Sequence, residues 1–157
     1  MRRKDREITD LAEIARIMAR CRVVNIAFSG DSPYVIPMNF GFTCEDGHFV
    51  LYMHGAGEGE KIHRMKADPR VAFSMFTDDV LLPGEIACRY TADFDSICGD
   101  GVLAFVEEEE KRFGLTKLMD QFEPGKTWTF EESMLRRVSI LRLDVRHISG
   151  KRHKTIR

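Results

Sequence analysis

The sequence predicts a mainly β protein, a small antiparallel barrel with helices at its periphery. Six or seven apolar, β-rich segments are bounded by turn-forming residues, whereas about three segments have helical periodicity. The β-rich segments mostly follow one another directly, and a parallel doubly wound sheet would need strands and helices to alternate. We therefore expect neighbouring strands to pair antiparallel and the sheet to curl into a barrel.

A chain of 157 residues is expected to form one domain, over residues 1–157, with a substantial core. The net charge of −1 argues against a general binder of nucleic acid or membrane surfaces. No apolar run approaches the ~18 residues of a membrane span. No apolar signal core follows the basic opening MRRKDREITD. These observations predict a cytoplasmic protein.

The cysteines and histidines do not have the spacing of a zinc site. No C-x-x-C pair is present, so we expect reduced thiols and no bound metal. His48 and His54 are six residues apart on one predicted strand and therefore share a face. They are either a metal-binding pair or, as we expect, part of an ordinary polar face. The four cysteines are Cys21, Cys44, Cys88 and Cys98.

The N-terminal third is predicted to contain a helix, a strand and a hairpin. Asp10 is placed to cap a helix whose apolar residues recur every three or four positions as far as Cys21. Residues 23–28 form a strand that ends at the turn SGDSP. Residues 34–42 and 48–54 form a hairpin around the turn CEDG.

The middle of the chain is predicted to contain a short helix and three strands. The helix covers residues 58–67 and ends at Asp68-Pro69. The strands cover residues 71–76, 85–94 and 96–106, and Asp78-Asp79 ends the first of them. The segment DFDSICGDG between the last two of these strands is rich in Asp and Gly and can form a bulge.

The C-terminal third is predicted to begin with a helix and to end with a strand. The run Glu107–Glu110 is expected to be the solvated first turn of a helix that continues to Pro124-Gly125. The segment KTWTFEESMLRR is expected to form a loop and a short helix, and residues 138–145 a last strand. The basic tail HISGKRHKTIR is either a frayed end or an arm that reaches an anion.

The stretch from Pro33 to Ile62 carries the candidate site. Pro37 cannot donate to a sheet ladder, so its strand needs an edge or a bulge there, which leaves backbone groups free for a ligand. The segment GAGEGEK then places three glycines and Lys61 before a helix. Bare amides, a lysine and a helix N-terminus form a natural phosphate-binding site, although an ordinary hairpin followed by a helix has the same pattern.

Other parts of the chain can complete such a cradle. Ser96 can add a hydroxyl donor and Lys151-Arg152 can add charge, while the strand IPMNF can form the apolar wall that a planar ligand requires. A flavin phosphate meets these requirements. The Walker pattern fails at Glu60 and Ile62, and the glycines do not match G-x-G-x-x-G. No G-x-S-x-G elbow is present, and a Cys–His pair for nucleophilic catalysis has no local support.

The order PYVIPMNFGF, turn, FVLYMHGAGEGEKI and KADPRVAFSMF resembles the flavin-binding split-barrel proteins related to pyridoxamine 5′-phosphate oxidase. Within this family it is most similar to the nitroimidazole-reductase branch, which is linked to 5-nitroimidazole antibiotic resistance. The opening segment, the region CRYTADFDSICGDGVLAFVEEEEKR and the closing VSILRLDVRHISGKRH extend the resemblance over most of the chain. The resemblance implies a six-stranded antiparallel split barrel that binds FMN at a homodimer interface.

The resemblance also implies particular flavin contacts. The first barrel strand would face the isoalloxazine, the segment after the second strand would lie beside it, Lys61 would bind the phosphate, and Ser96 would begin the later strand. Where relatives have an aromatic-Arg-Ser segment, this chain has Asp95 before Ser96, which is expected to weaken the phosphate site unless Lys151 or Arg152 compensates. The implied cofactor-binding residues are Ile36, Pro37, Met38, Asn39, Met53, His54, Gly55, Lys61 and Ser96.

The resulting hypothesis is an FMN-dependent oxidoreductase that reduces a small electrophile such as a nitroaromatic. His54 is the candidate proton donor, with a structural role as its alternative. Electrons would come from NAD(P)H or a reduced protein, and the partner chain would contribute Ser96, the Trp128 region or the basic tail to each site. One alternative is a non-catalytic flavin- or haem-binding protein. Another is oxidation of pyridoxamine 5′-phosphate, which the missing basic substrate residues disfavour.

Overall fold

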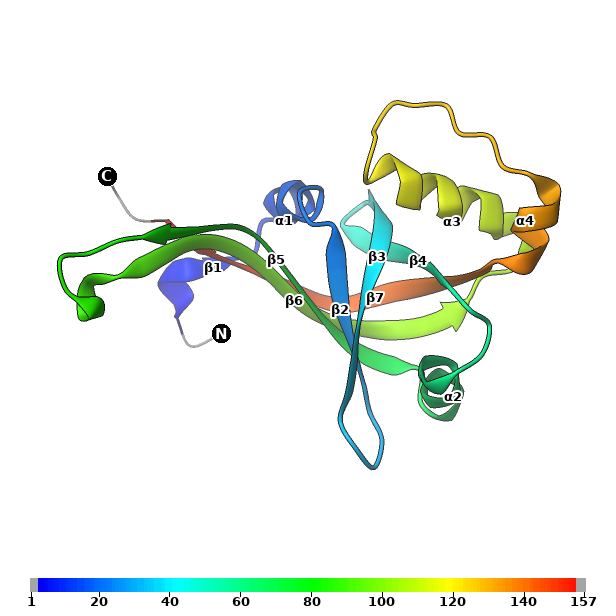
Figure 1. Cartoon of the computed structure of the whole chain (residues 1–157), viewed down its shortest axis with the longest axis horizontal. Helices are drawn as coiled ribbons and strands as arrows, with labels where there is room; N and C mark the ends of the chain where they lie inside the picture. The colour runs from blue at the N-terminus through cyan, green and yellow to red at the C-terminus, as the bar shows by residue number, and fades with distance from the viewer. Residues whose placement is uncertain (1–2, 155–157) are drawn as a thin grey trace.

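The computed structural model describes residues 3–154, which form a curled antiparallel sheet with helices around it (Figure 1). The strands are β1 (Glu7–Ile8), β2 (Val23–Phe28), β3 (Tyr34–Glu45), β4 (His48–Gly55), β5 (Arg70–Leu82), β6 (Thr91–Phe105) and β7 (Ser139–His153). The helices are α1 (Leu11–Met18), α2 (Glu60–Ala67), α3 (Glu108–Asp120) and α4 (Glu132–Arg137), with 3₁₀ turns at Lys4–Arg6 and Ala87–Arg89. None of the helices in the described part of the chain is long and apolar enough to cross a membrane.

Six of the strands form a closed barrel, which confirms the predicted fold class. The strand order is β7-β4-β3-β2-β5-β6, and β6 pairs with β7 to close the ring. All of these pairings are antiparallel. The short strand β1 lies outside the ring and pairs with the far end of β7, where Ile8 is opposite Gly150.

The N-terminal half of the fold follows the predicted local signals. The Asp10 side chain accepts a hydrogen bond from the Ala12 amide at 3.0 Å and caps α1. The turn between β3 and β4 has left-handed backbone at Asp46 (φ 50°) and Gly47 (φ 80°), the geometry that joins two strands by two residues. The predicted helix and hairpin are therefore confirmed at these positions.

The main core fills the barrel, and a second core lies between the barrel and α3. Along β4 the side chains from Phe49 to Met53 are all buried, because one face points into the barrel and the other faces α3. Helix α3 approaches β3 so closely that a Cβ on Gly41 would lie 2.0 Å from the Lys117 carbonyl oxygen. The barrel core also includes Ile14, Ile17, Met18, Val24, Ile26, Phe40, Phe73, Met75, Ile97, Leu103, Leu141 and Leu143.

Strands β5 and β6 are longer than predicted, because they pair with each other beyond the barrel. The Asp78-Asp79 segment does not end β5; it is an irregularity between Thr77 and Val80 after which pairing with β6 resumes. The predicted strands 85–94 and 96–106 are replaced by one strand, β6, that starts at Thr91. The two strands project from the barrel as a hairpin, opposite α3 and α4, and we call this hairpin the arm (Figure 1).

The basic tail is part of the barrel sheet as far as His153, so it is neither a frayed end nor a free arm there. Strand β7 runs from Ser139 to His153 and pairs with β6 along most of its length. The register shift between these strands lies between Asp100 and Gly101, and the extra residue, Arg146, is on β7 rather than on β6 as predicted. The last three residues of the tail lie outside the described part of the chain.

The acidic run before α3 is only partly a solvated helical turn. Glu108 and Glu109 are exposed, as predicted. Glu110 instead accepts hydrogen bonds from the Tyr52 hydroxyl at 2.7 Å and from Arg142 Nη1 at 2.9 Å. Burial and this hydrogen bond together raise the pKa of Tyr52. Glu110 therefore attaches α3 to the outside of β4 and β7.

Candidate functional site

The candidate site lies where β3 and β4 separate. These strands pair from Glu45 opposite His48 to Phe40 opposite Met53, and then diverge. β3 continues along β2 as far as Tyr34, while His54 and the following residue of β4 pair with β7. Residues 34–39 therefore have a neighbouring strand on one side only, and Pro37 lies in this edge segment. The predicted edge at Pro37 is confirmed.

Three of the predicted cofactor-binding residues meet at this divergence. Helix α2 begins after Gly59, whose backbone has φ +100° and which provides no side-chain cap. The Lys61 side chain folds back over β4. Its Nζ is so close to the strand that a Cβ atom added to Gly55 would lie 3.0 Å from it. The same Cβ would lie 3.8 Å from the Met38 methyl group. An ammonium, an uncapped helix N-terminus and a thioether on an open strand edge are thus brought together, a suitable arrangement for an anionic group attached to an apolar body.

Arg64 fixes the position of α2, and the sequence reasoning missed it. Its guanidinium donates to the Ser32 carbonyl and hydroxyl in the β2–β3 turn and lies 5.0 Å from the centre of the Tyr34 ring. It also donates to Glu60, four residues earlier on the same helix. Because Lys61 follows Glu60 directly, these bonds hold the start of α2 beside β3. The spacing of Arg64 one helical turn after Lys61 is the signal that could have identified it.

The remaining edge residues of β3 point to two different sides. Met38 and, in part, Ile36 are buried on the barrel side, whereas Pro37 and Asn39 are exposed on the outer side. The Asn39 amide nitrogen donates to the Arg22 carbonyl oxygen at 3.0 Å, across the β2–β3 pair. On β4, the Met53 side chain is wholly buried, so only its backbone can contact a ligand.

The two histidines of β4 lie at opposite ends of the strand. His54 is exposed and borders the divergence, next to Gly55. His48 lies at the hairpin turn with its Nε2 3.5 Å from an Asp144 carboxylate oxygen. Within residues 3–154 no group of three or more His, Cys, Asp or Glu side chains is arranged to hold a metal ion. Of the two histidines, His54 is therefore the one that adjoins Gly55 at the divergence of β3 and β4.

Ser96 lies far from Lys61 in the same chain. Gly55 is opposite Ser139 on β7, whereas Ser96 is opposite Lys151, twelve residues further along that strand. At ~3.3 Å per residue this separation is about 40 Å along the strand. One chain therefore does not bring Ser96 and Lys61 to the same phosphate.

Asp95 and Arg152 also differ from their predicted positions. The Asp95 side chain is only 1% exposed and lies on the same buried side of β6 as Ile97, so it is not on the surface beside Ser96. Arg152 donates to Asp95 from Nε at 2.7 Å and to Glu13 from Nη2 at 2.6 Å. Its guanidinium is thus engaged by these carboxylates and does not supply a free charge to the cradle. Lys151 Nζ lies 5.2 Å from the centre of the Phe94 ring.

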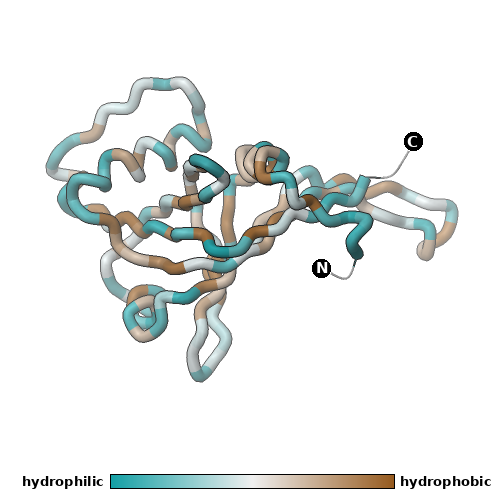
Figure 2. The backbone as a smooth tube through the Cα atoms, turned by 180° about the vertical axis from the view of Figure 1, so that it is seen from behind, coloured by the Kyte–Doolittle hydropathy of each residue, from teal (hydrophilic) through white to brown (hydrophobic). Residues whose placement is uncertain are grey.

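The outer side of β3, β2, β5 and β6 forms a second feature of the site, which we call the open face. Helix α3 covers the outer side of β4, of β7 and of the part of β3 that pairs with β4, but apolar side chains on the open face beyond it remain exposed. Pro37, Asn39 and Ser96 lie on this face, and hydrophobic residues continue along the backbone into the arm (Figure 2). The exposed apolar residues of the open face are Val23 (42%), Val35 (59%), Phe76 (64%) and Leu81 (66%).

The six-stranded barrel with diverging β3 and β4 defines the class of split-barrel folds. The family model of pyridoxamine 5′-phosphate oxidase matches residues 10–152, and the chain belongs to this family. No curated protein matches the sequence. The predicted family is therefore confirmed over nearly the whole chain.

Solved structures show the same fold. A protein of Bacteroides thetaiotaomicron, named for a presumed role in 5-nitroimidazole antibiotic resistance, is 26% identical; the match covers 92% of this chain and 85% of that one, with a TM-score of 0.78. The FAD and heme binding protein of Mycobacterium smegmatis is 18% identical over 96% of this chain and 74% of its own (TM-score 0.81). The flavocytochrome Anf3 of Azotobacter vinelandii is 17% identical over 99% and 72% (TM-score 0.79). The fold is thus one that flavin-binding proteins use.

Proposed function

We propose that this protein is an FMN-dependent oxidoreductase that reduces a small electrophile, such as a nitroaromatic compound. The observation that carries the proposal is the Lys61 ammonium beside Gly55 and Met38, at the divergence of β3 and β4. This position suits a phosphomonoester with an apolar ring system on the adjacent strand edge. The likeness to the Bacteroides protein supports the nitroaromatic substrate class.

Each part of the proposed site would have a separate role in binding the cofactor and reducing the substrate. FMN, when bound, supplies the redox chemistry, and the protein binds and orients it. Lys61 and the start of α2 would hold the phosphate, while the β3 edge from Ile36 to Asn39 would support the ring system. His54 is exposed at the end of β4 and would donate a proton to the substrate as it is reduced. NAD(P)H or a reduced protein would supply the electrons.

Binding of FMN to the purified protein tests the cofactor directly. We expect saturable quenching of FMN fluorescence, and weaker binding of FAD, because its diphosphate bridge does not present a terminal monoester to Lys61. Absence of FMN binding at high micromolar concentration, with circular dichroism showing a folded protein, would overturn the proposal. Flavin bleaching by NAD(P)H followed by turnover of a nitroaromatic supports the enzyme, whereas binding without turnover supports a carrier or sensor.

We also propose that two copies pair through the open face and share their flavin sites. Two observations support this arrangement: apolar side chains are exposed there, and Ser96 is remote from Lys61 within one chain. In the segment from Phe73 to Phe76, Phe73 and Met75 point into the core, so Phe76 is the apolar residue that this segment offers to the contact. A two-fold pairing would bury this surface and bring donors of one chain toward the cradle of the other.

A charge placed on the open face should separate the two copies. Light scattering of the unmodified protein is expected to give about twice the 18.1 kDa chain mass. Phe76→Glu buries a carboxylate in the proposed contact, so we expect a monomer with reduced FMN affinity. Met134→Glu is the matched control, since Met134 is equally exposed but lies on α4, outside the open face. A monomeric Phe76→Glu protein with full FMN affinity would contradict the shared site.

A further inference from the structure

A bulge in β7 places two basic side chains together on the outer side of the barrel. Asp100 is opposite His147 and Gly101 is opposite Val145, so Arg146 has no partner in the β6–β7 register. Strand residues normally alternate between the two faces, but here Arg146 and His147 are both exposed. Bulges commonly redirect a side chain near a functional site. The sequence reasoning placed the bulge on β6 and so missed Arg146.

Among the described residues, Arg146 has no ion-pair partner, unlike the basic residues around it. His147 Nδ1 lies 3.0 Å from an Asp100 carboxylate oxygen, so Asp100 already has a basic partner. Arg70, on β5, donates to Asp68 from Nε at 2.9 Å and from Nη2 at 2.8 Å, and these bonds lower the pKa of Asp68 to about 2. Among the ion pairs of residues 3–154, none includes Arg146. Its guanidinium is therefore free to bind an anion.

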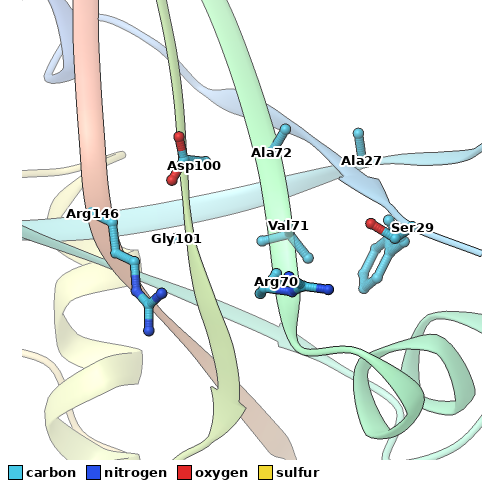
Figure 3. Close-up of a pocket in the computed structure, with 9 residues that line it drawn as sticks. Ala27, Ser29, Arg70, Val71, Ala72, Asp100, Gly101 and Arg146 are labelled. Atoms are coloured by element: carbon cyan, nitrogen blue, oxygen red, sulfur yellow. The ribbon is translucent and has the colours of Figure 1, made fainter.

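Arg146 and Arg70 line the same pocket, which has a volume of about 520 Å³. Figure 3 shows Arg70 lying between Arg146 and Ser29. This volume falls within the range of small-molecule sites. The remaining wall includes the Asp100 carboxylate, which His147 contacts, and three small residues that leave room for the body of a ligand: Ala27, Ala72 and Gly101.

We propose that this pocket binds a phosphate-bearing small molecule. The phosphate is held by the free guanidinium of Arg146, by the Ser29 hydroxyl and by Nη1 of Arg70, the terminal nitrogen that does not donate to Asp68. Guanidinium groups match the geometry of phosphate oxygens and remain charged at any physiological pH. Donors on three separate segments suit the three terminal oxygens of a phosphate better than the two oxygens of a carboxylate. The pocket shares no lining residue with the Lys61 cradle and does not depend on the flavin proposal. The pocket occupies the end of the open face that is remote from the arm, where Ala27 and Ala72 line it, whereas Phe76 and Leu81 lie further along β5, toward the arm.

Calorimetric titration with inorganic pyrophosphate tests this pocket. The titration uses the full chain with Lys61→Ala, so that the flavin cradle cannot account for the binding. Adding Arg146→Ala is expected to weaken binding about tenfold, or about 1.4 kcal/mol, and Arg146→Lys to recover part of the loss because it restores charge without the planar fork. Arg136→Ala, which removes an exposed arginine on α4, is the matched control and should change nothing.

The outcomes separate a specific pocket from general charge attraction. Absence of pyrophosphate binding, or equal losses in Arg146→Ala and Arg136→Ala, would overturn the proposal. Arg146 is exposed and unpaired, so its replacement should leave the melting temperature unchanged, and a folded Arg146→Ala protein keeps the test valid. A parallel titration with adenosine monophosphate that binds more tightly than pyrophosphate would support a ligand whose organic body rests on the small-residue wall.

Discussion

Replacing Asp95 with alanine is expected to lower the free energy of unfolding by about 3–5 kcal/mol. The carboxylate is 1% exposed and lies between two guanidiniums. Arg20 Nη2 donates to Oδ2 at 2.7 Å, and Arg152 Nε donates to Oδ1 at 2.7 Å. Removing the carboxylate leaves these two positive charges facing each other across a buried space. The cost is that of breaking a buried ion cluster, which is much larger than the loss of a surface pair.

The surrounding charges moderate this effect. Arg20 keeps a hydrogen bond to Asp78 at 3.0 Å, and Arg152 keeps one to Glu13 at 2.6 Å. Both guanidiniums are also more than a third exposed, at 39% and 35%, so water can solvate part of the charge that is left. We therefore expect a loss near the lower end of the range, with a fall in melting temperature of about 6–12 °C.

Urea denaturation without added flavin measures this loss, and Asp5→Ala provides the matched control. Arg3 donates to both carboxylate oxygens of Asp5, at 2.8 and 2.7 Å, so the hydrogen bonds resemble those at Asp95. This pair is exposed, however, and its removal is expected to have little effect. If Asp95→Ala and Asp5→Ala shift the denaturation midpoint by the same amount, the buried cluster does not stabilise the fold as we expect.

Lys61→Ala is expected to weaken the binding of FMN by about ten- to a hundredfold, while riboflavin binding should hardly change. The two ligands differ only in the phosphate, and Lys61 is the ammonium that folds over Gly55 at the candidate phosphate position. A charge-assisted hydrogen bond contributes roughly 1.5–3 kcal/mol, which corresponds to this range of affinity. Parallel fluorescence titrations of both ligands measure the difference.

Lys66→Ala is the matched control for Lys61. It removes an ammonium from the same helix, but from its last turn, where the side chain is exposed. FMN affinity should be unaffected, because long-range attraction to an exposed charge is screened by salt. Equal losses for FMN and riboflavin in Lys61→Ala would show that Lys61 supports the fold of the site rather than the phosphate.

Local signals were sufficient to predict the first half of the barrel. The Asp46-Gly47 turn allowed left-handed backbone at both residues, and Asp10 supplied a helix cap, so both elements formed where the sequence placed them. The edge at Pro37 followed from its missing amide proton. Lys61 could be assigned to the candidate site because a lysine that follows three glycines at the start of a helix is typical of a phosphate-binding site.

The arm and the charge cluster could not be predicted, because both depend on contacts that are remote in sequence. Asp78 has the left-handed backbone (φ 59°) expected at the end of a strand, yet β5 continues because β6 is available to pair with it. Asp95 resembled a surface residue, and only Arg20 and Arg152, 75 and 57 residues away, make its burial tolerable. Arg146 was missed for the same reason, since a bulge is defined by the register of two strands.

The long last strand also affects how the protein can form during synthesis. β7 pairs with β1, β4 and β6, and all three precede it in the chain. Strand β7 is therefore synthesised after the strands it pairs with. The barrel cannot close until residues 139–153 have left the ribosomal exit tunnel. Until then β4 and β6 present unpaired edges, the features that promote association between nascent chains. We expect the protein to be most dependent on chaperones during this interval.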